Sequence, residues 1–176
     1  MLNANLNKNT LSKSLLYQRI FEEINPLNKP VFMCVGTDKI VADSLGPIVA
    51  EKLKKSYRIP AYVYGGLDYN INATNLIECY NYIKTIHPNS AIVLIDATLA
   101  EDVGQVKICK GAFAGAGNVL PSIKIGDISI LGVVGKKGKD FRLNSVRIKD
   151  ILDMAEIIAN TIAMVYMQRE EFLDIL

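Results

Sequence analysis

Cysteine, histidine and long apolar runs are all scarce in this chain of 176 residues. The three cysteines, Cys34, Cys79 and Cys109, are odd in number and form no Cys-x-x-Cys pair, which argues against a disulfide framework and a zinc ribbon. No apolar run approaches the roughly 18 residues of a membrane span, and the N-terminal segment lacks the apolar core of a secretory signal. We therefore expect a cytoplasmic protein without a membrane partner.

An excess of either charge is also missing. The 20 basic and 18 acidic residues leave a formal charge of +2, and the lysines are dispersed along the chain, so no nucleic-acid partner is expected. In contrast, half of the residues are hydrophobic, which is enough for one substantial core. We predict a single domain over residues 1–176, with residues 1–10 loosely attached.

Strand-like and helix-like patterns alternate along the chain, which predicts an α/β fold. The expected strands lie at 31–35, 61–64, 91–95, 104–109 and 128–134, and the expected helices at 11–24, 48–53, 70–86 and 146–167. The run 91–95 is apolar without alternation, as in a strand covered by helices on both faces. The pattern predicts a three-layer α/β/α sandwich with a mostly parallel central sheet.

Two aspartates follow predicted strands. Asp43 lies between the strand 31–35 and the next helix, and Asp96 comes directly after the strand 91–95. Because ligand sites in such sheets lie at the carboxyl ends of the strands, we expect both carboxylates at one edge. Two neighbouring carboxylates cannot both ionise easily, so one holds a proton while the other activates water. The pair predicts aspartic-type catalysis, although each acid alone also fits a cap or loop position.

Nearby loop residues are candidates for substrate binding. Thr37 and Asp38 precede Asp43 and are expected to orient the pair, and Gly65 and Gly66 are expected to admit a substrate backbone. Asp68 fits either a binding role or, as we favour, the cap of the helix expected from residue 70.

The glycine-rich run GAFAGAG at 111–117 supplies Gly115 and Gly117 as further candidates. Their backbone amides fit a cleft wall that positions a peptide carbonyl, and a plain turn between strands fits equally well. The run lacks Gly-Lys-Ser/Thr, so nucleotide binding is disfavoured, and we expect no cofactor. Cys34, inside a predicted strand, fits an inert core thiol.

Four ordered segments resemble the YyaC family of sporulation proteins, which is related to the germination protease that degrades small acid-soluble spore proteins. They are CVGTDKIVADSLGP, YGGLDYNINATNL, LIDATLAEDVGQV and GAFAGAGNVLPSIKIGDISILGVV. The resemblance implies a phosphorylase/hydrolase-like sandwich in a sporulating cell or spore. It also implies a peptidase whose two aspartates match Asp43 and Asp96, with small acid-soluble spore proteins as the substrate class.

A more distant resemblance leads to the hydrogenase maturation endopeptidases, in which the corresponding acids and a histidine bind the nickel of the immature substrate. The only histidine here, His87, precedes the strand 91–95 whereas Asp96 follows it, so we expect them at opposite edges of the sheet. We therefore expect no metal site. A hydrogenase-type maturation peptidase and a non-catalytic binding protein on the same scaffold remain the alternatives.

The C-terminal segment REEFLDIL at 169–176 is amphipathic. It fits packing on its own domain as well as packing between identical chains, so a homo-oligomer is one expected form.

Overall fold

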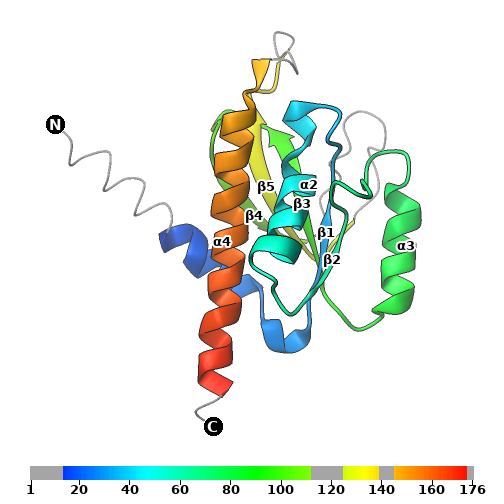
Figure 1. Ribbon diagram of the computed structural model, residues 1–176, viewed down its shortest axis with the longest axis vertical. Helices are drawn as coiled ribbons and strands as arrows, with labels where there is room; N and C mark the ends of the chain where they lie inside the picture. The colour runs from blue at the N-terminus through cyan, green and yellow to red at the C-terminus, as the bar shows by residue number, and fades with distance from the viewer. Residues whose placement is uncertain (1–13, 112–124, 139–144, 174–176) are drawn as a thin grey trace, which may run out of the picture.

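A five-stranded sheet forms the centre of the protein. The computed structural model describes residues 14–111, 125–138 and 145–173 (Figure 1). The strands are β1 (Val31–Cys34), β2 (Tyr62–Tyr64), β3 (Ile92–Leu99), β4 (Val106–Lys110) and β5 (Ile128–Gly135), in the order β2-β1-β3-β5-β4. All neighbouring pairs are parallel except β4 with β5. The predicted mostly parallel sheet is therefore confirmed.

Helices cover both faces of the sheet, which confirms the three-layer α/β/α sandwich (Figure 1). One face packs against the helical residues 14–23, α2 (Leu45–Glu51), the π-helical turn η3 (Lys52–Ser56) and α4 (Ile148–Leu173). The opposite face packs against α3 (Leu76–Ile86). Because both faces are covered, β1 is buried along its whole length, as its uninterrupted apolar sequence predicts.

The helix expected from residue 70 begins six residues later, at Leu76. Ile71, which fits the helical spacing, is buried for another reason: it forms a parallel bridge with Val35 beyond the end of β1. Asparagine side chains then bind nearby backbone, with the Asn72 N–H donating to Asn75 Oδ1 at 2.8 Å. Asp68 lies well before this helix, so the favoured reading of Asp68 as its cap was wrong.

Strand β3 is longer than predicted and ends at Leu99 instead of Ile95. Residues 96–99 pair with β5 as far as Gly135. This pairing explains why they continue the strand although the first of them, Asp96, is a poor strand former. In the described parts of the chain, no helix is long and apolar enough to cross a membrane.

Candidate functional site

Asp96 lies inside β3, opposite Leu131 of β5 and one residue beyond the last pair that β3 forms with β1. Its side chain is buried, with only 5% of the residue surface exposed. By strand alternation it shares the α3 face of the sheet with Leu94. The Ala97 N–H donates a hydrogen bond to Asp96 Oδ1 at 2.7 Å. A carboxyl group is thus held in the interior where β1 ends.

Asp43 is brought to the same edge by a tight loop after β1. It ends the short helix η2 (Val41–Asp43) and is half-buried. The Thr37 N–H donates to the Asp43 carbonyl oxygen at 2.9 Å. Gly36 has a φ of +134°, and a Cβ there would lie 2.0 Å from that same oxygen, so only glycine allows this approach.

Electrostatics link the two acids. Burial is the main cause that raises the pKa of Asp96 well above its usual range, and the charge of Asp43 raises it further, against the opposing Ala97 N–H. Burial also raises the pKa of Asp43, while the Thr37 backbone N–H lowers it. Both shifts favour the protonated form, and the shift is larger for Asp96, so Asp96 is the better candidate for a proton donor and Asp43 for a base.

The remaining predicted residues are distributed around this edge. Thr37 lies beside Asp43, as described above. Asp38 is exposed on the same loop. Asp68 is also exposed, and its carboxylate forms an ion pair with Lys55 at 3.5 Å. Gly115 and Gly117 lie outside the described residues, so their predicted role stays a prediction.

Gly65 and Gly66 are required by local packing. Both have positive φ angles, and a Cβ on Gly65 would lie 2.2 Å from the Cys34 carbonyl oxygen. A Cβ on Gly66 would lie 2.7 Å from Lys54 Nζ and 2.9 Å from Glu51 Oε1. The two glycines thus let this loop approach β1 and α2, and their contact with substrate stays a prediction.

A groove of about 490 Å³ opens next to the Asp43 loop. Its exposed surface is mainly apolar and comes from Val41, Ile48, Leu67, Ile148 and Leu152, and the charged residues Asp38, Glu51, Lys52 and Lys55 also line it. Neither Asp43 nor Asp96 is among the described residues that line it. The groove therefore adjoins the acid pair without containing it.

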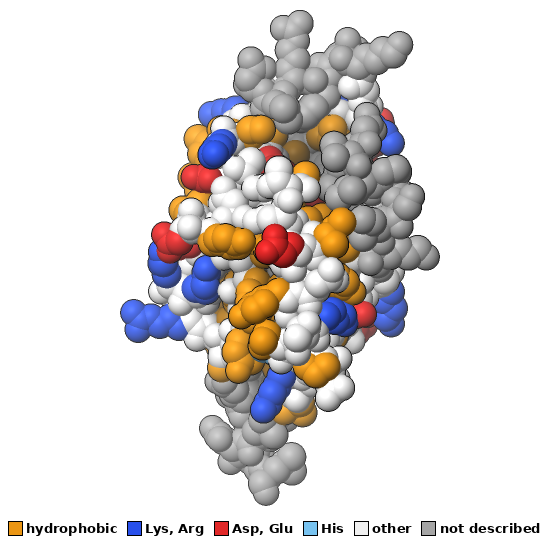
Figure 2. Space-filling view, turned by 90° about the vertical axis from the view of Figure 1, so that its right-hand side faces the viewer, with side chains coloured by type: hydrophobic (Ala, Val, Ile, Leu, Met, Phe, Trp, Pro, Cys, Tyr) orange, Lys and Arg blue, Asp and Glu red, His pale blue; other side chains and the backbone are white. Residues whose placement is uncertain are grey.

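His87 lies at the other edge of the sheet, as predicted. Its Nε2 atom is 2.8 Å from the Tyr64 hydroxyl, and its ring lies 4.3 Å from that of Tyr62, at the start of β2. This aromatic cluster belongs to the α3 side of the molecule, where hydrophobic side chains are exposed in a band (Figure 2). Within the described residues, no group of three or more histidine, cysteine or acidic side chains is placed to hold a metal.

Cys34 is fully buried in β1, and burial raises the pKa of its thiol to about 12. The thiolate is the nucleophilic form of cysteine, so this residue is unsuited to covalent catalysis. The predicted place of Cys34 in the core is confirmed, and its inertness stays a prediction.

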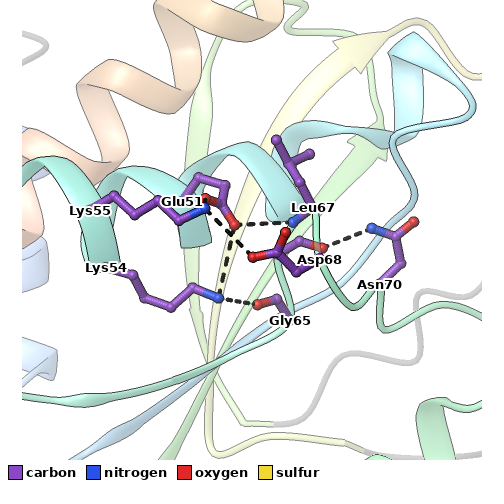
Figure 3. Close-up of polar contacts among 8 residues, drawn as sticks. Glu51, Lys54, Lys55, Gly65, Leu67, Asp68 and Asn70 are labelled. Carbon is purple, nitrogen blue, oxygen red and sulfur yellow. Dashed lines mark hydrogen bonds and ion pairs between the residues drawn. The ribbon is translucent and has the colours of Figure 1, made fainter.

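A network that the sequence analysis missed fixes the loop after β2 (Figure 3). Glu51 Oε2 pairs with Lys55 Nζ at 2.6 Å, and Glu51 Oε1 accepts a hydrogen bond from the Leu67 N–H at 3.2 Å. Glu51 and Lys55 are four residues apart, a spacing that is common for ion pairs on exposed helices. The sequence therefore does not indicate that Glu51 also binds the Leu67 N–H. Asn70, which binds Gly66 and Thr37, was also missed, although its asparagine-rich surroundings favour a turn.

Comparisons with known proteins agree with this architecture. Residues 3–161 match the family model described as "Protein of unknown function (DUF1256)". The chain is 33% identical to the uncharacterized protein YyaC of Bacillus subtilis (strain 168) over 139 residues, covering 76% of this chain and 68% of that protein.

One solved structure has a similar α/β fold, and a second shows a weaker likeness. A peptidyl-tRNA hydrolase in complex with N-propanol has a TM-score of 0.50 at 12% identity, covering 80% of this chain and 94% of the other. The [NiFe] hydrogenase maturation protease HycI from Thermococcus kodakarensis KOD1 has a TM-score of 0.45 at 17% identity, with 77% and 92% covered. The family match spans most of the sequence, and the chain belongs to the DUF1256 family together with YyaC.

Proposed function

We propose that this protein is an aspartic-type peptidase of the germination-protease kind, which hydrolyses peptide bonds in a protein substrate. The observation that carries the proposal is the burial of the Asp96 carboxyl where β1 ends, at the carboxyl end of a parallel sheet and within reach of the charge of Asp43. Ligand sites concentrate at this edge in α/β proteins. The resemblance of the surrounding motifs to the YyaC family, which is related to the germination protease, supports the same two residues.

The electrostatics suggest a division of roles. Asp43 carries the charge and takes a proton from water as the water oxygen attacks the scissile carbonyl carbon. Asp96 donates its proton to the carbonyl oxygen. The tetrahedral intermediate then collapses as Asp43 passes the proton to the leaving amine and the C–N bond breaks. Asp96 regains its proton from one hydroxyl of the intermediate, whose oxygen becomes the carbonyl oxygen of the new carboxylic acid. One water is consumed, and the products are a carboxylic acid and an amine.

Small acid-soluble spore proteins are the proposed substrate class, which places the activity in a sporulating cell or spore. This part of the proposal is supported by the motif resemblance.

The direct test is cleavage of these substrates by the purified protein, read by intact-mass spectrometry. Asp43→Asn and Asp96→Asn each remove one partner of the proton transfer, so we expect each to lower kcat by roughly 10²–10⁴-fold. Asp153→Asn is the matched control, since Asp153 is exposed on α4 and pairs with Lys149, and it should retain parental activity.

Two results would overturn the proposal. One is defined cleavage that persists in both site variants. The other is a folded parent protein that leaves every substrate intact over a wide pH range, in which case the scaffold serves binding and not hydrolysis.

A further inference from the structure

Asn70 joins the two loops that follow β1 and β2. Thr37 Oγ1 donates a hydrogen bond to Asn70 Oδ1 at 3.0 Å. Asn70 Nδ2 donates to the Gly66 carbonyl oxygen at 2.8 Å (Figure 3). The side-chain amide thus uses its acceptor toward one loop and its donor toward the other. An aspartate at this position would keep the acceptor and lose the donor, and an alanine would lose both.

Asn70 thus bridges the loops that carry Thr37 and Gly66. The loop that carries Gly66 is also bound by side chains of α2 and η3. Lys54 Nζ donates to the Gly65 carbonyl oxygen at 2.7 Å, and Glu51 accepts from the Leu67 N–H at 3.2 Å (Figure 3). The Glu51 side chain is only 14% exposed and also pairs with Lys55. The loop after β2 therefore has a fixed position without help from Asn70.

The loop that carries Thr37 also contacts Asp43, one of the two acids. The Thr37 N–H donates to the Asp43 carbonyl oxygen at 2.9 Å, and the Lys39 N–H donates to Thr37 Oγ1 at 3.3 Å. The Thr37 backbone N–H also lowers the pKa of Asp43, against the effect of burial. The position of Thr37 therefore sets the surroundings of Asp43.

We infer that Asn70 is a positioning residue of the Asp43–Asp96 site, which fixes Thr37 against the Gly66 loop and thereby holds Asp43 in place. This inference rests on the proposed function. No described hydrogen bond joins Asn70 to either acid, so it acts through Thr37. Since small misplacements of a catalytic group are costly, Asn70→Ala should lower kcat about 10- to 100-fold and change KM by less than about 3-fold.

The experiment combines kinetics with ¹³C NMR titration of the aspartate side-chain carboxyl groups. In Asn70→Ala, the Thr37 N–H leaves its fixed place and the pKa of Asp43 should rise. Asn81→Ala is the matched control, because Asn81 is exposed on α3, away from both loops. Its titration and kinetics should equal those of the parent. A folded Asn70→Ala variant in which Asp43 titrates as in the parent would overturn the inference.

A second pair of variants removes the same hydrogen bond from its other end, in case Asn70→Ala fails to fold. Thr37→Val deletes the hydroxyl and should reproduce the rise of the Asp43 pKa, whereas Thr37→Ser keeps the hydroxyl and should preserve the parental titration. The same pKa of Asp43 in Thr37→Val and Thr37→Ser would contradict a role of the Thr37–Asn70 hydrogen bond in positioning Asp43.

The titration needs no substrate, so it separates this inference from the proposed function. If Asp43 responds to Asn70→Ala in a protein that cleaves nothing, the positioning contact is supported and the peptidase proposal fails. If an active enzyme shows an unchanged Asp43 titration in Asn70→Ala, only the positioning role is overturned.

Discussion

Two aspartates of this chain show how differently a carboxyl group can be placed. Asp68 is exposed and pairs with Lys55, which is the ordinary situation of a surface acid. Asp96 is buried, and its described contacts include no cation; its charged neighbour is another acid, Asp43. Burying an ionisable group without an opposite charge costs stability, and such costs concentrate at functional sites.

Replacing Asp96 should therefore stabilise the protein. Because the folded-state pKa of Asp96 is raised, the folded protein holds this proton more tightly than the unfolded chain does, and its free energy of unfolding falls as pH rises above the ordinary value of about 3.9. Asp96→Asn keeps an acceptor for the Ala97 N–H and removes this decrease in the free energy of unfolding.

We expect Asp96→Asn to unfold at a higher temperature than the parent at neutral pH, with the difference vanishing as pH falls below about 3.9. Each ~1 kcal/mol gained corresponds to a rise in Tm of about 2–4 °C. Calorimetric scans over a pH series measure this. A lower Tm at neutral pH would instead indicate that Asp96 is a structural acid.

The cysteines give a second test at the residue scale. Cys109 is exposed, whereas Cys34 is fully buried with its thiol pKa raised to about 12. Iodoacetamide should therefore label Cys109 in the folded protein and reach Cys34 only after unfolding. Peptide mapping of a labelling time course measures the order. Modification of Cys34 at the rate of Cys109 would contradict the burial of β1.

Asp43 and Asp96 were predictable from the sequence because each acid interrupts apolar sequence near the end of a buried strand. Glu51 and Asn70 were not, since their partners lie on loops whose approach depends on the tertiary fold. Gly65 and Gly66 were recognised, but their role in backbone packing became visible only with Cys34 and α2 in place.

At the scale of elements, the start of α2 is packed directly onto β1. A Cβ on Gly46 would lie 2.0 Å from the Val35 carbonyl oxygen, and these are backbone atoms that cannot rotate away. The close approach brings the η2 turn with Asp43 to the end of β1. Glycine at this position is thus a requirement of the site as well as of the core.

Gly46→Ala should consequently destabilise the protein strongly. Overpacking in a core costs roughly 1–3 kcal/mol and occasionally more, and we expect this backbone clash to reach the upper end. Gly138→Ala is the control, because a Cβ there has nothing within 4 Å. Urea unfolding measures both free energies, and equal stability of the two variants would contradict the contact between α2 and β1.

The order and type of the elements followed from the sequence, but several boundaries did not. Each strand was predicted because its apolar run is bounded by glycine, proline or polar residues. The start of α3 was misplaced because Ile71 satisfies helical spacing and is buried by a strand bridge instead. The extension of β3 to Leu99 depends on pairing with β5, which lies about 30 residues further along the chain.

At the scale of the whole molecule, the residues of the candidate site come together only when three strands and their loops are assembled. β1 and β3 pair in parallel, so that Cys34 lies opposite Ile95 and Asp96 follows at the end of β1. The loop after β1 supplies Asp43, and the loop after β2 supplies Asn70 (Figure 1). Asp43, far from Asp96 in the sequence, thereby comes close enough for its charge to raise the pKa of Asp96.

The most direct test of this effect is ¹³C carboxyl titration of Asp96 in the parent and in Asp43→Asn, with Asp68→Asn as the control. We predict that Asp96 titrates well above the usual aspartate range, and that Asp43→Asn lowers its pKa because a like charge is removed while burial persists. Asp68→Asn should leave it unchanged. An Asp96 titration that is identical in the parent and in Asp43→Asn would contradict the coupled pair.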